Sequence, residues 1–282
     1  MRETIGFWWR LLWPLTLLPP VIYLLDAWWH LPANWRGATA MGLFIVPQLA
    51  VYATTIYLHR GIAHRSLRFH GAADLVFRGV LWVTTGLPRR EWGAVHMKHH
   101  AHTDGPDDPH SPLQRGLLKV QLGNLFLYLR EARNPETVRV FAARIPRDWA
   151  DRNIFEHWIG RNVGFLLGTG VLVWMFGPGP GILAALLHFV MYVFVLSPTV
   201  NGLCHWWGLK NFANTAFNHP LLAWLIGGET LHNNHHAYQG SPNFRAKRYE
   251  FDPAWYVIRL LAMIGAITFI GKTIPQEEGS RA

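Results

Sequence analysis

Residues 38–58, ATAMGLFIVPQLAVYATTIYL, lead directly into His59. The stretch holds no charged residue and is long enough to cross a bilayer, because a spanning helix needs about 20 mostly apolar residues. Pro47 lies inside it, where a proline removes a helix hydrogen bond and favours a kink. These residues therefore predict a membrane-spanning helix that delivers His59 to the membrane surface.

Three other segments predict further spans. Residues 7–28 are apolar enough for a first anchor, and they show neither the short basic start nor the small-residue cleavage site of a signal peptide. Residues 162–176 and 180–200 flank a Gly-Pro-Gly-Pro turn and predict a second hairpin. We therefore expect four transmembrane helices in a single domain that covers residues 1–282.

Two more apolar segments are expected to stay at the membrane surface. Residues 72–87 contain Asp74 and Arg78, and charges are costly inside a bilayer, so this segment predicts a peripheral or re-entrant helix. Residues 255–270 contain Arg259 and are expected to lie along the interface.

The composition also predicts a membrane protein. Of the 282 residues, 50% are hydrophobic and only 15% are charged, and 15 are Trp, a balance that is unusual for a soluble protein. The net charge of +9 does not predict a nucleic-acid partner, because the basic residues form no stretch interleaved with aromatic residues.

The distribution of basic residues predicts the topology. Residues 59–157 hold 15 of the 26 Lys and Arg residues and residues 201–282 hold 7, whereas the two loops inside the hairpins hold only Arg36. Cytoplasmic loops carry an excess of Lys and Arg, so both polar segments and both termini are expected in the cytoplasm. The predicted fold is an all-α integral membrane protein with a cytosolic helical cap.

Histidine is the residue type best placed to hold a metal. Cys204 is the only cysteine, so no cysteine-pair metal motif is possible, but the chain has 16 histidines. Eleven of them lie in four patches within the two polar segments. The candidate metal-site residues in these patches are His59, His64, His96, His99, His100, Asn201, His205, His232, His235 and His236.

The spacing within each patch suits a metal site. His59 and His64 would diverge by about 140° on an α-helix with its roughly 100° per residue, so they suit a helix end that curls around a metal. Each of the two HxxHH triplets places its first ring near both later rings on one helical face. Asn201 and His205 lie one turn apart just beyond the last span.

Nine histidines exceed the needs of one tetrahedral zinc and predict a dinuclear site. Imidazole suits zinc, copper, iron and nickel alike, so the ligand type does not select the metal. A lipid-facing enzyme that attacks an unactivated alkyl chain requires an oxidant made from dioxygen, and iron provides one.

Other residues are expected to support the site or to be unrelated to it. Asp104, Asp107 and Asp108 are candidates for orienting ligand imidazoles, which usually donate their second N–H to a partner, and His102 and His110 belong to the same run. The remaining histidines are expected to be interfacial or core residues: His30, His70, His157, His188 and His219.

Four stretches, in order HRGIAHR, HMKHHAHTDGPDDPH, NGLCH and GGETLHNNHHAY, resemble the membrane acyl-CoA desaturases of the stearoyl-CoA type. The resemblance runs from about residue 38 to residue 265, and YEFDPAWYVIRLL resembles bacterial members. It implies four transmembrane helices below a cytosolic cap, in a bacterial inner membrane, and a kinked acyl tunnel past two irons. It assigns His59, His64, His96, His100 and His235 to one iron, and His99, His205, His232 and His236 to the other, with Asn201 nearby through water.

The resemblance also implies the reaction and the partners. A reduced iron pair with dioxygen would insert a cis double bond into a saturated long-chain acyl group. No redox domain is recognisable in the sequence, so an external electron donor is expected, such as a ferredoxin, a rubredoxin or a cytochrome b5-like protein, docking on the basic face. Membrane lipids surround the spans.

One departure from the family bears on the acyl carrier. The animal enzymes have an Arg-Asp pair that contacts CoA immediately before the first HxxHH triplet, and this chain has Ala94-Val95. Acyl-CoA, acyl-carrier protein and acyl-lipid therefore all stay open as substrates. Arg89, Arg90 and Lys98 are candidates for contacting a phosphate-bearing carrier or anionic lipid.

Two other function classes compete with desaturation. A hydroxylase or other oxidase could use the same ligands. A metal transporter or haem-binding membrane protein is disfavoured, because transport requires ionisable groups along the spans and His188 is the only histidine well inside one.

Overall fold

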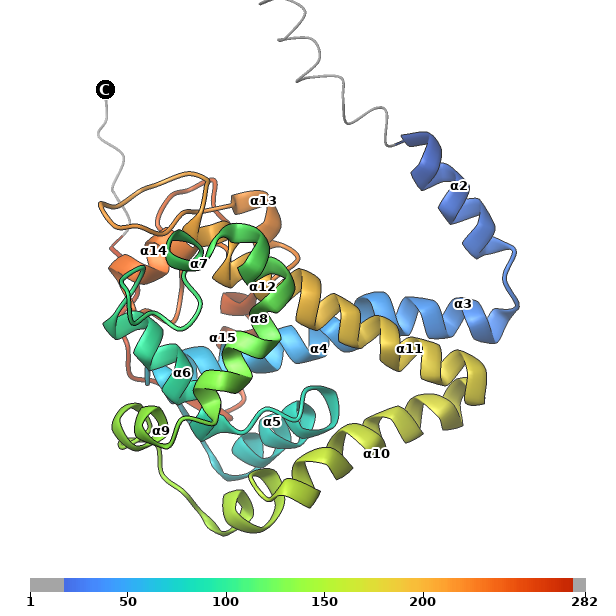
Figure 1. Cartoon of the computed structure of the whole chain (residues 1–282), viewed down its shortest axis with the longest axis horizontal. Helices are drawn as coiled ribbons and strands as arrows, with labels where there is room; N and C mark the ends of the chain where they lie inside the picture. Colours follow the sequence, from blue (N-terminus) through green and yellow to red (C-terminus); the bar gives the residue numbers. More distant parts are fainter. Residues whose placement is uncertain (1–17, 276–282) are drawn as a thin grey trace, which may run out of the picture.

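The computed structural model describes residues 18–275, and nearly all of its elements are helical (Figure 1). In chain order they are α2 (Leu18–Trp29), α3 (Ala33–Ala40), η2 (Met41–Ile45), α4 (Val46–Ala53), η3 (Thr54–Ala63), β1 (Leu67–Phe69), α5 (Gly71–Thr84), α6 (Arg89–Ala101), α7 (Pro112–Arg115), α8 (Leu117–Ala132), α9 (Pro135–Phe141), η4 (Asp151–Phe155), α10 (Trp158–Phe176), α11 (Pro178–Val190), η5 (Met191–Leu196), α12 (Ser197–Asn201), η6 (Leu203–His205), α13 (Pro220–Ala223), α14 (His232–Ala237), α15 (Pro253–Met263) and β2 (Ile267–Phe269).

Three continuous helices in the described part are long and apolar enough to cross a membrane. They are Ala33–Ala63, Ile159–Phe176 and Pro178–His205, and they contain the predicted spans 38–58, 162–176 and 180–200. The predicted span 7–28 overlaps α2, but residues 7–17 lie outside the described residues. The number of four spans and the cytosolic position of the cap therefore stay predictions.

Close helix contacts hold the spanning helices together. A Cβ atom on Gly42 would lie 2.4 Å from the backbone oxygen of Ala184, so the first and third of these helices touch through their backbones. Small residues permit this approach in membranes, where association depends on packing rather than on apolar burial. Ala38, Leu172 and Ala184 form the buried cluster around this contact.

The helix that ends near His59 departs from α-helical geometry. A π-helical turn at Met41–Ile45 precedes Pro47, and π-helical geometry returns over Thr54–Ala63. In π-helical geometry the hydrogen bond spans five residues, and the His64 N–H indeed donates to the His59 oxygen at 3.0 Å. Residues five apart therefore lie one turn apart here, which the α-helical spacing did not predict.

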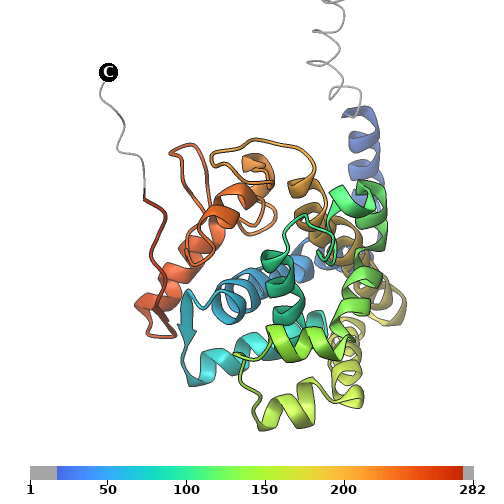
Figure 2. The same ribbon diagram turned by 60° about the vertical axis from the view of Figure 1, so that its left-hand side comes forward.

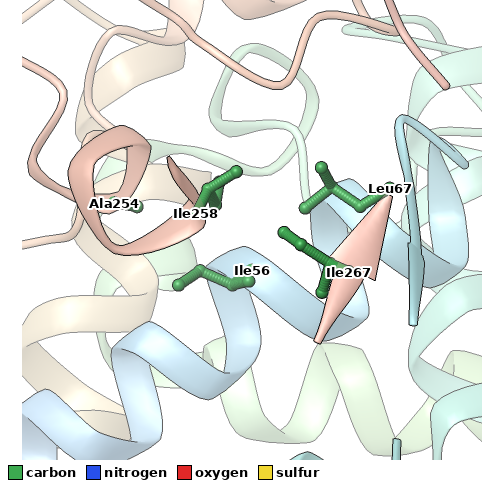
Figure 3. Close-up of a cluster of buried hydrophobic side chains, with 5 residues drawn as sticks. All are labelled: Ile56, Leu67, Ala254, Ile258 and Ile267. Atoms are coloured by element: carbon green, nitrogen blue, oxygen red, sulfur yellow. The ribbon is translucent and has the colours of Figure 1, made fainter. Parts of the chain in front are cut away.

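The all-α prediction is wrong in one detail. The two short strands β1 and β2 pair antiparallel, with Leu67 opposite Phe269. They close over a buried cluster that joins η3 to α15 through Ile56, Ile258 and Ile267 (Figure 3). The segment predicted as one interfacial stretch at 255–270 thus divides into α15 and β2, because Gly265 turns the chain with a positive φ of 72°.

The C-terminal part of the chain lies beside the first spanning helix. In Figure 2 its orange and red elements flank the blue helix on one side, and the green α6 and α8 lie on the other. Helix α14 and helix α6 are thereby held on either side of the end of η3. This arrangement brings the histidines of distant segments together.

Helix α5 contains Asp74 and Arg78, the charged residues that predicted a peripheral or re-entrant helix instead of a span. Arg78 is buried, but it forms ion pairs with Asp148 at 2.7 Å and Asp151 at 2.8 Å. Arg89 pairs with the same two aspartates at 3.1 and 2.7 Å. At 14 residues, α5 is only about 21 Å long at 1.5 Å per residue, too short for the roughly 30 Å hydrocarbon core.

Candidate metal centre

The nine predicted histidines come together in two neighbouring groups. The first contains His59, His64, His96, His100 and His235, and the second contains His99, His205, His232 and His236. Within each group the candidate ligand atoms lie within 4.8 Å of one another. The division is the same as the one that the family resemblance implied, although coordination of a metal stays a proposal.

In the first group the Nε2 atoms converge. His235 Nε2 lies 2.9 Å from His59 Nε2 and 3.0 Å from His100 Nε2. His64 Nε2 lies 2.9 Å from His96 Nε2. Two nitrogens that each lie about 2.1 Å from one metal, at roughly a right angle, are about 3 Å apart, so these separations suit ligands of a shared ion.

The second group has the same character. His232 Nε2 lies 2.9 Å from His205 Nε2 and 3.1 Å from His236 Nε2. His99 Nε2 lies 3.4 Å from His236 Nε2. The adjacent residues His99 and His100 face different groups, as their opposed directions on α6 require.

Carboxylates fix the ring orientation of three histidines. His59 Nδ1 lies 2.6 Å from Glu229, His99 Nδ1 lies 2.9 Å from Asp108, and His205 Nδ1 lies 2.9 Å from Asp104. A ring that donates its Nδ1 proton to a carboxylate keeps Nε2 unprotonated and directed at the metal position. Asp104 and Asp108 pair with candidate ligand imidazoles, as expected, whereas Asp107 is exposed and forms no such pair. That these imidazoles bind metal stays a prediction.

The electrostatics keep the imidazoles neutral. Burial lowers the pKa of His96, His100 and His235 well below the ordinary value, and neighbouring histidines lower it further. Burial alone would raise the pKa of Asp108, but the bond with His99 outweighs it and the pKa falls below its usual value. Neutral imidazole is the form that binds metal.

An amide network positions α14. The Asn233 side chain donates to the Asn214 oxygen at 2.7 Å and accepts from the Asn211 N–H at 2.7 Å. Asn234 Nδ2 donates to Glu250 at 2.8 Å. The two asparagines inside HNNHH therefore fix the short helix that carries three of the histidines, a role that the sequence analysis missed.

The sequence analysis also missed Glu229, which lies three residues before His232. Its carboxylate accepts from the Thr55 hydroxyl, lies 3.5 Å from Arg60 Nη1 and pairs with His59. Arg60 in turn binds Asp252 at 2.9 Å. The only sequence signal for this role was an acidic residue three positions before the second HxxHH triplet. Its partner His59 lies 170 residues earlier in the chain.

The remaining predicted residues have other roles. Asn201 Nδ2 donates to Asn124 at 3.0 Å, and Asn201 lines the same cavity as His99, so its place at the metal stays a prediction. His110 stacks on His99 with ring centroids 4.7 Å apart and completes a third set with Asp108. Within the described residues His102, which belongs to the same run as His110, lies outside all three sets, and so do the histidines that were expected to be unrelated to the site: His30, His70, His157, His188 and His219.

The basic residues proposed to meet a phosphate are occupied internally. Arg89 binds Asp151, Arg90 donates to the Ile145 oxygen, and Lys98 pairs with Glu131 at 2.6 Å. A cation that is already paired with a protein carboxylate has little attraction left for another anion. The expectation that these three side chains contact a carrier phosphate is therefore not supported.

A cavity of about 600 Å³ adjoins the histidines. Its walls include His96 and His232 as well as apolar side chains of the spans, such as Phe165, Val193 and Leu196. The volume lies within the roughly 300–1,000 Å³ of small-molecule sites. A long apolar molecule in this cavity would pass beside both groups.

Comparison with known proteins agrees with this architecture. The sequence profile described as fatty acid desaturase matches residues 33–259. Delta-9 acyl-lipid desaturase 1 of Arabidopsis thaliana is 31% identical over 264 residues, which cover 89% of this chain and 80% of that protein. Acyl-CoA C20 Delta5-desaturase of Anemone leveillei is 29% identical over 233 residues, covering 80% and 71%.

A third relative acts on a named lipid. Palmitoyl-monogalactosyldiacylglycerol delta-7 desaturase of Arabidopsis thaliana is 28% identical over 239 residues, which cover 83% of this chain and 62% of that protein. The helices, the histidines and these matches define a membrane oxidoreductase of lipid metabolism. The chain belongs to the fatty acid desaturase family.

Proposed function

We propose that this protein is an oxygen-dependent desaturase that inserts a cis double bond into a saturated acyl chain at a di-iron centre. The observation that carries the proposal is the junction of an apolar cavity with two groups of converging imidazole nitrogens. The first iron would be held by the group around His59, and the second by the group around His205.

The residues present fit such a metal pair. Each group offers four or five imidazole nitrogen donors, and the carboxylates behind His59, His99 and His205 favour metal-bound Nε2. Imidazole sites also accept copper and zinc, so the ligand type does not identify the metal. Iron is proposed because the reaction requires it. The separate donor positions of His99 and His100 allow α6 to serve both ions.

When bound, the irons would supply, with dioxygen, two external electrons and two protons, the oxidising power to remove two hydrogens from adjacent methylenes and release two water molecules. The protein contributes position. Trp92 and Val95 precede His96 on α6 and line the cavity, so the alkyl chain they contact lies beside the imidazoles. A displacement of about 1 Å can cost a hundredfold in rate, so the packed walls of the cavity would set the attacked carbon.

Electrons would come from a separate protein that docks on the cytoplasmic side. Lys119, Arg130 and Arg133 on or next to α8 are exposed and form a basic face suited to an acidic ferredoxin, rubredoxin or cytochrome b5-like donor. The cytoplasmic position of this face belongs to the same proposal.

Product analysis tests the function. Membranes from a host that expresses the chain should convert saturated acyl groups to cis-monoenes, detected by mass spectrometry with double-bond localisation. His100→Ala and His236→Ala, one from each group, should abolish conversion, and His70→Ala, which lies outside both groups, should not. An alcohol as the only product would show that the protein is a hydroxylase and not a desaturase. Full activity of both ligand variants would refute the proposed site.

A further inference from the structure

The cavity reaches the outer surface of two spanning helices. Leu166 on α10 lines the cavity, yet 66% of it is exposed, and Phe189 on α11 lines the cavity and is 37% exposed. A side chain meets both conditions only where a cavity approaches the surface. Because α10 and the continuous helix that contains α11 are long and apolar enough to cross a membrane, we infer that the surface at this point faces lipid rather than water.

The two helices are in close contact only near the turn that joins them. Near their turn they touch, and a Cβ atom on Gly181 would lie 2.5 Å from the Cα of Val173. Figure 1 shows them separating from this turn toward the histidine-bearing part of the molecule. Leu166 lies seven residues before Val173 on α10, Phe189 lies eight residues after Gly181 on α11, and both line the cavity. We call the gap between these two side chains the lateral opening.

Polar groups line the cavity at the same end of α10. Arg161 pairs with Glu91 at 2.6 Å, so together they present no net charge. Among the described residues, the buried hydroxyl of Tyr128 has no hydrogen-bond partner. Buried polar groups are almost always hydrogen-bonded, so this hydroxyl is suited to donate to a ligand atom in the cavity.

The Tyr128 hydroxyl lies close to the ion pair and stays protonated. Burial raises the pKa of Tyr128 well above its ordinary value, Glu91 raises it further and Arg161 lowers it. A protonated phenol beside a neutral ion pair suits an uncharged acceptor, such as an ester carbonyl. It does not resemble the basic cluster that phosphate recognition requires.

Along α10, the polar lining of the cavity at Arg161 and the apolar lining at Leu166 are separated by a short distance. Arg161 precedes Leu166 by five residues, or about 7.5 Å along α10 at 1.5 Å per residue. Arg161 lies in the first turn of the helix, and after Asn162 the α10 residues that line the cavity are the apolar Phe165 and Leu166. Polar groups that suit an ester and apolar side chains that suit an alkyl chain therefore both line the cavity.

We propose that the substrate is the acyl chain of a membrane glycerolipid, which enters sideways from the bilayer through the lateral opening while the Tyr128 hydroxyl donates to its ester carbonyl. This inference rests on the proposed function and names the acyl carrier. The burial of Ala94 and Val95, at 0% and 2% exposure, agrees with a carrier that needs no contact there.

A doubly labelled lipid tests the carrier. Washed membranes that contain the full chain and its donor receive vesicles of distearoyl phosphatidylglycerol labelled with heavy isotopes in both the glycerol and the acyl chains. Parallel samples receive labelled stearoyl-CoA. Desaturation on the lipid leaves both labels in one unsaturated molecule, whereas transfer through CoA separates the acyl label from the glycerol label.

Matched variants test the route. Leu166→Trp fills the lateral opening, and Leu167→Trp adds the same bulk to the adjacent position, which is 50% exposed but does not line the cavity. We expect Leu166→Trp to lower lipid desaturation at least fivefold at equal protein in the membrane, and Leu167→Trp to leave it unchanged. Tyr128→Phe should raise the half-saturating lipid concentration by about 2- to 10-fold with little change in maximal rate, the value of one hydrogen bond.

The outcomes separate this inference from the proposed function. Doubly labelled monoene that responds only to Leu166→Trp and Tyr128→Phe supports lateral access by a lipid. Conversion of stearoyl-CoA alone, or equal effects of Leu166→Trp and Leu167→Trp, overturns this inference and leaves desaturation standing. No conversion of either substrate by the wild-type protein overturns the proposed function and this inference with it.

Discussion

At the level of single residues, three carboxylates hold three of the candidate ligand histidines. Local spacing predicted the nine histidines, because the HxxHH patterns place rings on one helical face. It could not predict the pairs: Asp108 is nine residues from His99, but Asp104 is 101 residues from His205. The match of Glu229 to His59 depends on how α14 is held against η3, which no local pattern encodes.

Replacing Glu229 by glutamine tests this orienting role. Glutamine keeps the size and an acceptor oxygen but removes the charge that favours the Nδ1-protonated His59 ring. Loss of such a supporting partner typically costs about 10- to 100-fold in metal affinity. If the two groups hold iron as proposed, we expect one of the two irons to leave at lower chelator concentration, as measured by iron content per chain after graded dialysis.

The control for this experiment is Asp107→Asn, which changes an exposed carboxylate in the other histidine-rich segment. Its iron content should match that of the wild-type protein at every chelator concentration. Equal retention of both irons in Glu229→Gln would show that Glu229 does not orient a ligand.

At the level of elements, the sequence predicted the apolar helices well and the geometry inside them poorly. The length of residues 38–58 was sufficient to identify a span, but hydropathy carries no signal for the π-helical turns of Thr54–Ala63 that align His59 with His64. The strands β1 and β2 are three residues each, and their paired residues are at least 198 positions apart along the chain, so only tertiary packing reveals them.

Helix packing yields a prediction with a control on the same element. A Cβ atom on Gly168 would lie 2.2 Å from the Val83 oxygen of α5, whereas a Cβ atom on Gly170 would meet nothing within 4 Å. Gly168→Ala should therefore destabilise the protein by about 1–3 kcal/mol through overpacking. Gly170→Ala should be neutral or slightly stabilising, because alanine is the better helix former.

Thermal unfolding in one detergent measures both glycine variants. Unfolding temperatures that fall equally for Gly168→Ala and Gly170→Ala would contradict the close approach of α5 and α10. A decrease that is confined to Gly168→Ala would support it.

The ion-pair cluster between α5, α6 and η4 predicts a dependence on pH. Arg78 lowers the pKa of Asp148 below its ordinary value, so this carboxylate stabilises the fold above the unfolded-state pKa of about 3.9 and loses that contribution as the pH falls through its folded value. Because 46% of the Asp148 side chain is exposed, solvent screening limits the effect to at most about 1 kcal/mol.

The variant Asp148→Asn measures this contribution. It should unfold at a lower temperature than the wild-type protein at pH 7, and the difference should shrink below about pH 4, where the wild-type carboxylate begins to lose its charge. A difference that stays constant down to pH 3 would assign the effect of the mutation to packing instead of charge.

At the level of the whole molecule, the sequence predicted which segments meet, because the histidine patches need a common centre. The cap's internal order was not predictable: the Asn233 and Asn234 network, and the pairing of Arg89, Arg90 and Lys98 with internal partners, all join distant segments. A basic residue near a histidine motif looks the same in sequence whether it binds a ligand or another part of the fold.

The two histidine groups join η3, α6, η6 and α14, so metal should hold the cap together. A ligand present at 100 times its dissociation constant stabilises the folded state by about 2.7 kcal/mol, so iron-loaded protein should unfold at a higher temperature than chelated protein. Acid should remove this advantage. Burial lowers the pKa of His96, His100 and His235, so the folded state holds them neutral, and stability decreases as the pH falls below their unfolded pKa of about 6.5. Unfolding temperatures that do not change on chelation at pH 7.5 would show that no metal links these four elements.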